Sequence, residues 1–496
     1  MNRRHAPFML FVFASLLFGM WAGLVRSGWQ LPQLHDDFAL AHGVLMIGGF
    51  MGTLINLERA VALNAFLRTP RRRLLPYLAP LFSATGALAL IINLSFAALL
   101  LTLSSLGMIL MFAYIVHKHP AVYTLTMATG AMCWFMGNLI WLGGEPLFMS
   151  VPWWMAFLIL TIAGERLELA RLMRHSRRSI HLFAIAAALW VTGLLMTRSD
   201  YDLGVRCIGV GDLGIAFWLL RYDVIRRTIR QRGLPRFIAV CLAAGYFWLI
   251  ISGLMALYYG GVKAGMRYDA LLHSVFLGFA FSMIFGHAPI ILPSVLRINI
   301  RYSSLFYVPL VLLHLSLLLR VGGDLSAWQD GRQWGAMLNA LVLLLFIGSM
   351  VRSLHTDSGQ PLLPRRKFAM AGYGLIVTGF LSGVVLVSTD LDEKLNGGVT
   401  GNNSTTQGER LYQTNCSACH GVDLQGINGL GKNLLESDFV ASQNDAALHR
   451  FIVQGRPIWD VANTTGVEMP PRGGNPSLKD SEIDAIIAFI RAKSTP

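Results

Sequence analysis

Long apolar runs recur through the first 388 residues of the sequence, and they constrain the fold more than any other feature. Each run has at least 17 residues, enough for a helix to cross a hydrocarbon core of about 30 Å. The composition agrees, because 54% of the 496 residues are hydrophobic and only 14% are charged. We therefore predict an all-α fold, with residues 1–388 forming a polytopic transmembrane helix bundle of about 13 spans. The runs cover 6–25, 39–57, 75–93, 96–117, 121–143, 150–170, 180–197, 204–221, 235–258, 268–293, 304–320, 334–352 and 367–388.

The loop charges predict the orientation. The net charge is +14, but residues 401–496 contain eight Lys and Arg against ten Asp and Glu, so the positive excess belongs to the membrane part. Its basic residues fall in alternate loops, the positive-inside pattern, which excludes a nucleic-acid partner. We expect a bacterial inner-membrane protein with a cytoplasmic N-terminus and a first span retained as an anchor rather than cleaved. The basic loops contain Arg3, Arg71, Lys118, Arg174, Arg230, Arg301 and Arg365, and the others contain Asp36, Asp200, Asp202 and Asp324.

The tail carries a haem-attachment pattern, C-x-x-C-H, at Cys416, Cys419 and His420. Two thiols at this spacing add to the vinyl groups of a haem, and the adjacent imidazole binds the iron. About fifty residues downstream, Met469 precedes two prolines that would stiffen its loop. A thioether is a common sixth ligand in electron-transfer cytochromes. We predict covalent haem c with iron ligands His420 and Met469, and interpret the rival ligand, His449, as a surface residue.

From about residue 408 to the end, the tail resembles a class I cytochrome c. The resemblance rests on the C-x-x-C-H motif, Tyr412 before it, Gly421 after it, the Met469 loop and a terminal helical pattern. It implies a small α-helical cytochrome domain at 408–496. Residues 389–407 are rich in Asp, Gly, Asn, Ser and Thr, which is typical of a flexible linker. Because haem c is attached outside the cytoplasm in bacteria, this domain is expected in the periplasm, in agreement with the charge pattern.

Four histidines lie at least three residues away from the ends of predicted spans: His42, His273, His287 and His314. An ionisable side chain within a bilayer costs free energy, so such residues are functional candidates. His42 and His273 each lie a few residues into a span that enters from the outside, so we predict that they share a depth and bind a redox metal or haem. The alternative is that each ring bonds a nearby carbonyl or hydroxyl group.

Two further resemblances concern these spans. His287 follows His273 by fourteen residues, about 21 Å along one helix face, which is similar to the two-haem helices of cytochrome b. That resemblance implies two b haems, with His314 as an inner partner. The stretch that begins at Ala41 and His42 and runs into Gly48 resembles a helix of the NnrS-type membrane proteins of denitrifying bacteria, which implies haem b and copper.

The sequence thus favours a membrane-bound cytochrome that passes electrons between a periplasmic haem c and a haem or metal site in the bundle, coupled to nitrogen-oxide or oxygen chemistry. Such a respiratory oxidoreductase would contact membrane lipid and a periplasmic electron donor or acceptor protein. One alternative is a quinol:cytochrome c oxidoreductase with b haems. Another is a metal or small-molecule transporter or sensor that carries a cytochrome tail.

Overall fold

The computed structural model describes residues 5–29, 31–32, 38–64, 66–67, 69, 73–170, 176–296, 298–326, 328–355, 403–427, 430–456, 460–465, 467, 469–475 and 478–494. The predicted thirteenth span, 367–388, lies outside these residues, and so does the predicted linker up to residue 402. The helix α17 (Asn403–Asn415) begins inside the segment predicted as a linker, five residues before the predicted start of the cytochrome domain.

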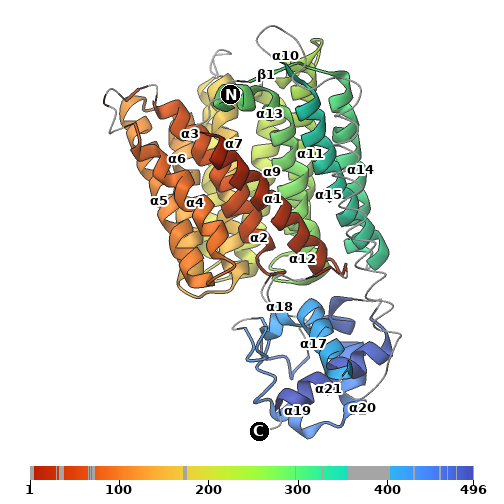
Figure 1. Cartoon of the computed structure of the whole chain (residues 1–496). Helices are drawn as coiled ribbons and strands as arrows, with labels where there is room; N and C mark the ends of the chain where they lie inside the picture. The colour runs from red at the N-terminus through yellow and green to blue at the C-terminus, as the bar shows by residue number, and fades with distance from the viewer. Residues whose placement is uncertain are drawn as a thin grey trace.

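The fold is all-α and polytopic, as predicted (Figure 1). Among the described residues, eleven helices are long and apolar enough to cross a membrane, and Leu75–Ala89 is a shorter apolar helix. Together they account for the first twelve predicted spans. The single-helix spans are α1 (Ala6–Arg26), α5 (Leu94–Lys118), α6 (Val122–Leu142), α7 (Leu147–Ala170), α8 (Arg177–Met196), α9 (Tyr201–Tyr222), α11 (Leu234–Tyr259) and α15 (Gln329–Arg352).

The other spans are composite. Leu75–Ala89 joins the 3-10 turn η2 (Leu75–Tyr77) to α4 (Leu78–Ala89), and η5 (Ser304–Phe306) precedes α14 (Tyr307–Leu325). A short helix, α10 (Ile225–Thr228), lies between α9 and α11. The two-residue strands β1 (Asn299–Ile300) and β2 (Leu354–His355) pair antiparallel.

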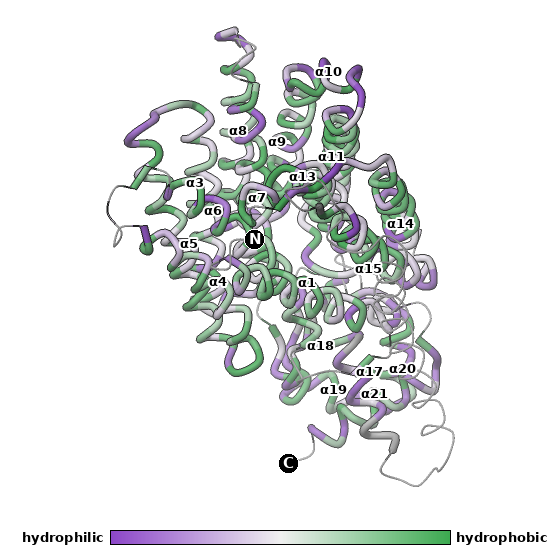
Figure 2. The backbone as a smooth tube through the Cα atoms, turned by 45° about the horizontal axis from the view of Figure 1, so that its top comes forward, coloured by the Kyte–Doolittle hydropathy of each residue, from purple (hydrophilic) through white to green (hydrophobic). Residues whose placement is uncertain are grey.

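Apolar side chains cover the outside of the bundle as well as its core. Leu10, Ile92 and Leu110 are large, apolar and more than 60% exposed. Figure 2 shows hydrophobic positions along the helices and hydrophilic ones concentrated at their ends. Lipid tails accept such a surface, whereas water would not. By contrast α7 is largely buried, with Trp154, Phe157 and Ile159 almost inaccessible, so it runs through the interior.

Two spans contain a π-helix that begins within three residues of a predicted functional histidine. One span consists of α2 (His42–Val44), the π-helix η1 (Leu45–Gly52) and α3 (Thr53–Asn64). The other consists of α12 (Gly265–His273), the π-helix η4 (Ser274–Phe281) and α13 (Ser282–Leu296). Long π-helical segments are rare and occur mostly at functional sites.

The two π-helical spans also meet at equivalent positions. Phe50 and Phe281 each lie eight residues beyond their histidine, and their rings stack with centroids 5.7 Å apart and an interplanar angle of 12°. The spans therefore form a related pair in the middle of the bundle, each packed on the helix that precedes it in the chain, η1 on α1 and η4 on α11.

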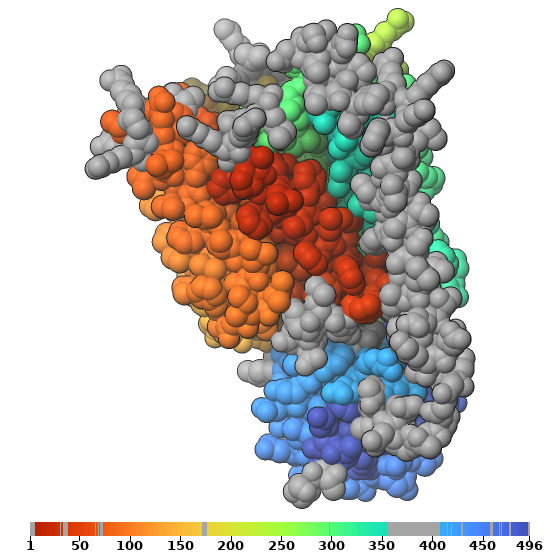
Figure 3. Space-filling view, in the orientation of Figure 1, coloured from red at the N-terminus to blue at the C-terminus, as the bar shows by residue number. Residues whose placement is uncertain are grey.

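The C-terminal domain packs around its first and last helices, α17 and α21 (Asp480–Ser494). Tyr412 of α17 contacts Phe489 of α21, with ring centroids 5.5 Å apart, and its hydroxyl donates to the Gly421 carbonyl. Figures 1 and 3 show this domain against the end of the bundle where α2 and α12 begin. The remaining helices are α18 (Ser417–His420), α19 (Asp438–Ser442), α20 (Asp445–Gln454) and η6 (Pro471–Gly474).

Candidate redox centres

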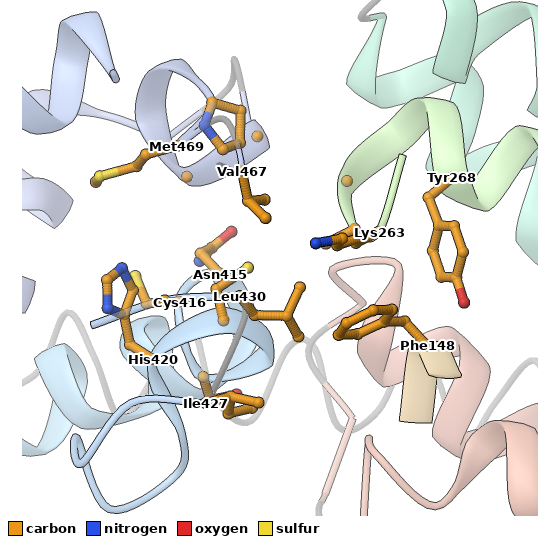
Figure 4. A pocket seen from close by; sticks show the side chains of 18 of the residues that line it. Phe148, Lys263, Tyr268, Asn415, Cys416, His420, Ile427, Leu430, Val467 and Met469 are labelled. Atoms are coloured by element: carbon orange, nitrogen blue, oxygen red, sulfur yellow. The ribbon is translucent and has the colours of Figure 1, made fainter. Parts of the chain in front are cut away.

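A cavity of about 2080 Å³ lies between the C-terminal domain and the membrane bundle. Cys416, Cys419, His420 and Met469 line it on one side, and His42 and His273 line it on the other. Figure 4 shows the Met469 thioether and the His420 imidazole on opposite sides of one hollow, with Cys416 beside them. The six residues predicted to bind the two redox groups therefore share one cavity.

The surroundings of His420 leave one ring nitrogen available to a metal. Its Nδ1 lies 2.9 Å from the Lys432 carbonyl, which can only accept, so Nδ1 carries the proton. Nε2 then has a free lone pair. Burial lowers the pKa of His420 below its ordinary value, which keeps the ring neutral, as a ligand must be. The residue fits the role of an iron ligand.

The backbone N–H and C=O groups of Met469 are both hydrogen-bonded, which anchors its loop. Met469 donates to and accepts from Arg456, with N···O distances of 2.9 and 2.8 Å, and the first of its two prolines follows directly. The partner segment follows α20, so the loop is tied to a helix of the domain core. These bonds fix the backbone that presents the thioether to the cavity.

Cys416 stands at the N-cap of the single turn of α18, Cys419 lies within that turn, and both thiols are free. Burial raises the pKa of the Cys416 thiol to about 12, so it is protonated at neutral pH. A zinc or redox C-x-x-C site needs thiolates, and a zinc site also needs further ligands. Among the described residues, no group of three His, Cys, Asp or Glu side chains is arranged to hold a metal ion. The thiols fit covalent haem attachment better than either alternative.

His449 is turned away from the cavity. Its Nδ1 lies 2.7 Å from an oxygen of Asp484 on α21, and it is not among the cavity-lining residues. The side chain is 21% exposed and paired, so it is half-buried rather than the simple surface residue we expected. Its role here is to join α20 to α21.

The imidazoles of His42 and His273 lie side by side, as their shared depth predicted. Their ring centroids are 6.1 Å apart and the interplanar angle is 20°. The Nδ1 of His42 donates to the Gly19 carbonyl at 2.7 Å, and the Nδ1 of His273 donates to the Asp269 carbonyl at 2.9 Å. Each Nδ1 thus carries its proton, and no contact to a described residue occupies either Nε2. Two free lone pairs therefore lie close together in a buried setting.

The spacing of these rings fits ligation of one metal from two sides. Two imidazoles bound through Nε2 to opposite sides of a metal have centroids roughly 6 Å apart, since each metal–nitrogen bond is about 2 Å and each ring adds its radius. A protein site for bare copper or zinc usually has three or four ligands. A haem supplies four nitrogens itself and needs only two axial ligands. The donor set therefore fits a haem better than bare copper.

His287 and His314 are engaged elsewhere. The Nδ1 of His287 bonds the Met283 carbonyl at 2.7 Å, and its Nε2 accepts from Arg166 at 3.0 Å. The Nδ1 of His314 accepts from the Trp248 indole at 3.0 Å, so in a neutral ring the proton lies on Nε2. Neither ring offers a free lone pair, and these contacts argue against both residues as ligands and against an inner b haem.

Comparison with known families divides the chain into the same two parts as the fold, the membrane bundle and the C-terminal domain. Residues 4–355 match the family model described as "Domain of unknown function (DUF8744)", which names no activity. Residues 403–490 match the model described as "Cytochrome C oxidase, cbb3-type, subunit III". No curated protein and no solved structure matches the chain. The C-terminal domain is therefore a cytochrome c domain, which implies haem c, and the resemblance of the membrane part to NnrS-type proteins has no support from these comparisons.

Proposed function

This chain belongs to the DUF8744 family, and we propose that it is a bacterial inner-membrane cytochrome in which a periplasmic haem c exchanges electrons with a second haem, held by His42 and His273. That it is a membrane-bound cytochrome follows from its spans and its cytochrome c domain. We propose in addition the second centre, the orientation of the protein in the membrane and the roles of the residues.

In the C-terminal domain, Cys416 and Cys419 would hold haem c by thioether bonds, with His420 and Met469 as iron ligands. Bound haem c supplies a one-electron couple. Lys432 orients His420 through its carbonyl, and the Arg456 backbone fixes the loop of Met469. The protein thus contributes ligand geometry and a half-buried setting for one-electron transfer.

In the bundle, His42 and His273 would hold the iron of the second haem from two helices. Their Nδ1 protons are fixed by the carbonyls of Gly19 and Asp269, which leaves both Nε2 atoms for the metal. Two imidazole ligands, together with the four nitrogens of the haem, would complete the coordination of the iron. This arrangement favours electron transfer over binding of nitrogen oxides or oxygen at the same iron.

The observation that carries the proposal is the shared cavity, which His42, His273, His420 and Met469 all line. Figure 4 shows Phe148, Lys263 and Tyr268 of the membrane part facing Ile427 and Leu430 of the cytochrome domain across it. Two redox groups bound at its two walls would be close together in a protein-filled medium. A transporter with an unrelated cytochrome tail would not require this juxtaposition.

The test is a reduced-minus-oxidised spectrum with haem and copper analysis of the purified full-length protein and of His42→Ala and His273→Ala. We expect one c haem and one b haem in the wild type, and loss of the b signal alone in each variant. Haem c as the sole cofactor would refute the proposed second centre. An additional b haem that survives both substitutions would favour the quinol:cytochrome c reading.

A further inference from the structure

We infer that the Asp269 carboxylate, held in place by Arg320, positions His273 and makes the two membrane histidines chemically unequal ligands. This inference rests on the proposed redox centre at His42 and His273. Asp269 and Arg320 would then tune the redox potential of that centre through His273 alone.

The contact follows from the helix geometry. Asp269 and His273 lie four residues apart on α12, so their side chains stack on one helix face. The Nδ1 of His273 is 2.9 Å from the Asp269 carbonyl and 3.3 Å from its Oδ1. One N–H group is therefore shared between a backbone oxygen and a carboxylate oxygen of the same residue.

Arg320 of α14 holds the other carboxylate oxygen. Its Nε and one terminal nitrogen lie 3.2 and 2.9 Å from Oδ2 of Asp269. The two carboxylate oxygens thus have different partners: Oδ2 faces the guanidinium and Oδ1 faces the imidazole. Asp269, His273 and Arg320 are each at most 9% exposed. A buried carboxylate without a cation would be very costly, and Arg320 is the cation in direct contact with this one.

His42 has no such support. Its Nδ1 bonds only the Gly19 carbonyl, a neutral acceptor on α1. Metal-bound histidines commonly donate their second nitrogen to a carbonyl or a carboxylate, and a carboxylate makes the imidazole the more basic ligand. His273 is therefore the stronger electron donor, and it favours the oxidised state of the iron.

A purely structural role predicts something different. If the Asp269–Arg320 ion pair only joined α12 to α14, its removal would lower stability without changing a bound haem's potential. If it tunes His273, a neutral residue at 269 raises the potential of the membrane haem, because the oxidised iron loses an anion that favours it. Haem c, with ligands in another domain, serves as an internal reference.

The decisive variant is Asp269→Asn in the full-length protein, read by a redox titration of both haems and by electron paramagnetic resonance of the oxidised form. We expect the b-haem potential to shift upward and its low-spin signal to change, with haem c unaffected. Retention of the membrane haem should weaken by about 10- to 100-fold, the usual cost of removing such a partner. The matched control is Asp212→Asn, which removes a fully buried carboxylate bonded to Trp190 and Ser252.

Arg320→Lys provides a second test if Asp269→Asn does not fold. It keeps the charge but loses the two-nitrogen contact with Oδ2, so the resonance signal of the membrane haem should change while haem c stays constant. A membrane haem whose potential and signal match the wild type in Asp269→Asn, or whose signal matches it in Arg320→Lys, would overturn the inference. Absence of a membrane haem from the wild type would instead refute the proposed function.

Discussion

At the scale of single residues, the two proposed centres depend on side chains that line one cavity and keep a ligand atom free. His420 and His273 each use Nδ1 for a local acceptor and keep Nε2 free, whereas His287 uses both ring nitrogens. The hydrogen bonds of each ring therefore distinguish candidate ligands from structural histidines better than depth in the membrane does.

We predict that Met469→Ala keeps haem c attached, because the thioether bonds remain, but lowers its potential and removes the sulfur–iron absorption band. A redox titration and an absorption spectrum of the oxidised protein measure both effects. His449→Ala is the control, since that ring faces Asp484 and not the cavity. An unchanged spectrum in Met469→Ala would rule this residue out as a ligand.

Gly23 of α1 leaves room for the His42 ring. A Cβ at this position would lie 2.8 Å from both Cε1 and Nδ1 of His42, which is too close for real contacts. Gly23→Ala should therefore displace the ring and reduce the content of the membrane haem while leaving haem c in place. Gly43→Ala is a matched control, because its Cβ would meet nothing within 4 Å. Equal b-haem content in the two variants would contradict the proposed position of the ligand.

At the scale of elements, the π-helical spans bring distant segments into equivalent positions. The ring of His42 lies against that of His273, and the ring of Phe50 lies against that of Phe281. The equivalence stops further inward. Fourteen residues beyond His42 stands Asn56, which donates to Ser104, and fourteen beyond His273 stands His287, which accepts from Arg166.

The inner cluster has a structural explanation. Arg166 of α7 lies 3.0 Å from Asp223, which also accepts from Tyr246 of α11, and Arg59 of α3 pairs with Glu165 of α7. These ion pairs join the helices around α7 in the half of the bundle away from the cytochrome domain. Buried charges that satisfy one another need no redox group.

We therefore predict that His287→Gln leaves both haem signals unchanged. Glutamine can still accept from Arg166 through its amide oxygen, so the cluster keeps its main contact. Difference spectra and redox titration of the purified variant measure the outcome, with His273→Ala as the positive control for loss of b haem. Disappearance of a b haem from His287→Gln would revive the two-haem arrangement.

At the scale of the whole molecule, the cytochrome domain lies against one end of the bundle (Figure 3), and His42 and His273 line the cavity between them. The positive-inside pattern predicts the same end to be periplasmic. The cofactor chemistry and the charge distribution thus predict the same orientation.

This orientation predicts the behaviour of reporter fusions. A reporter that is active only outside the cytoplasm should work when joined after Asp324 and fail when joined after Arg230. A second reporter, active only in the cytoplasm, should give the reverse result and controls for expression. Periplasmic activity at Arg230 would overturn the predicted topology through that point.

The sequence by itself determined the first twelve spans and the haem-attachment motif, and it predicted a common depth for His42 and His273. These features are local: a helix needs a certain apolar length to cross a bilayer, and C-x-x-C-H is contained in five residues. His42 and His273 are 231 positions apart, and their contact depends on how η1 and η4 pack, which only the tertiary structure decided. The tertiary structure also decided that Arg166 donates to Nε2 of His287 and that Arg320 binds the Asp269 carboxylate. Such pairings arise from side chains on different helices, and no periodicity along one segment encodes them.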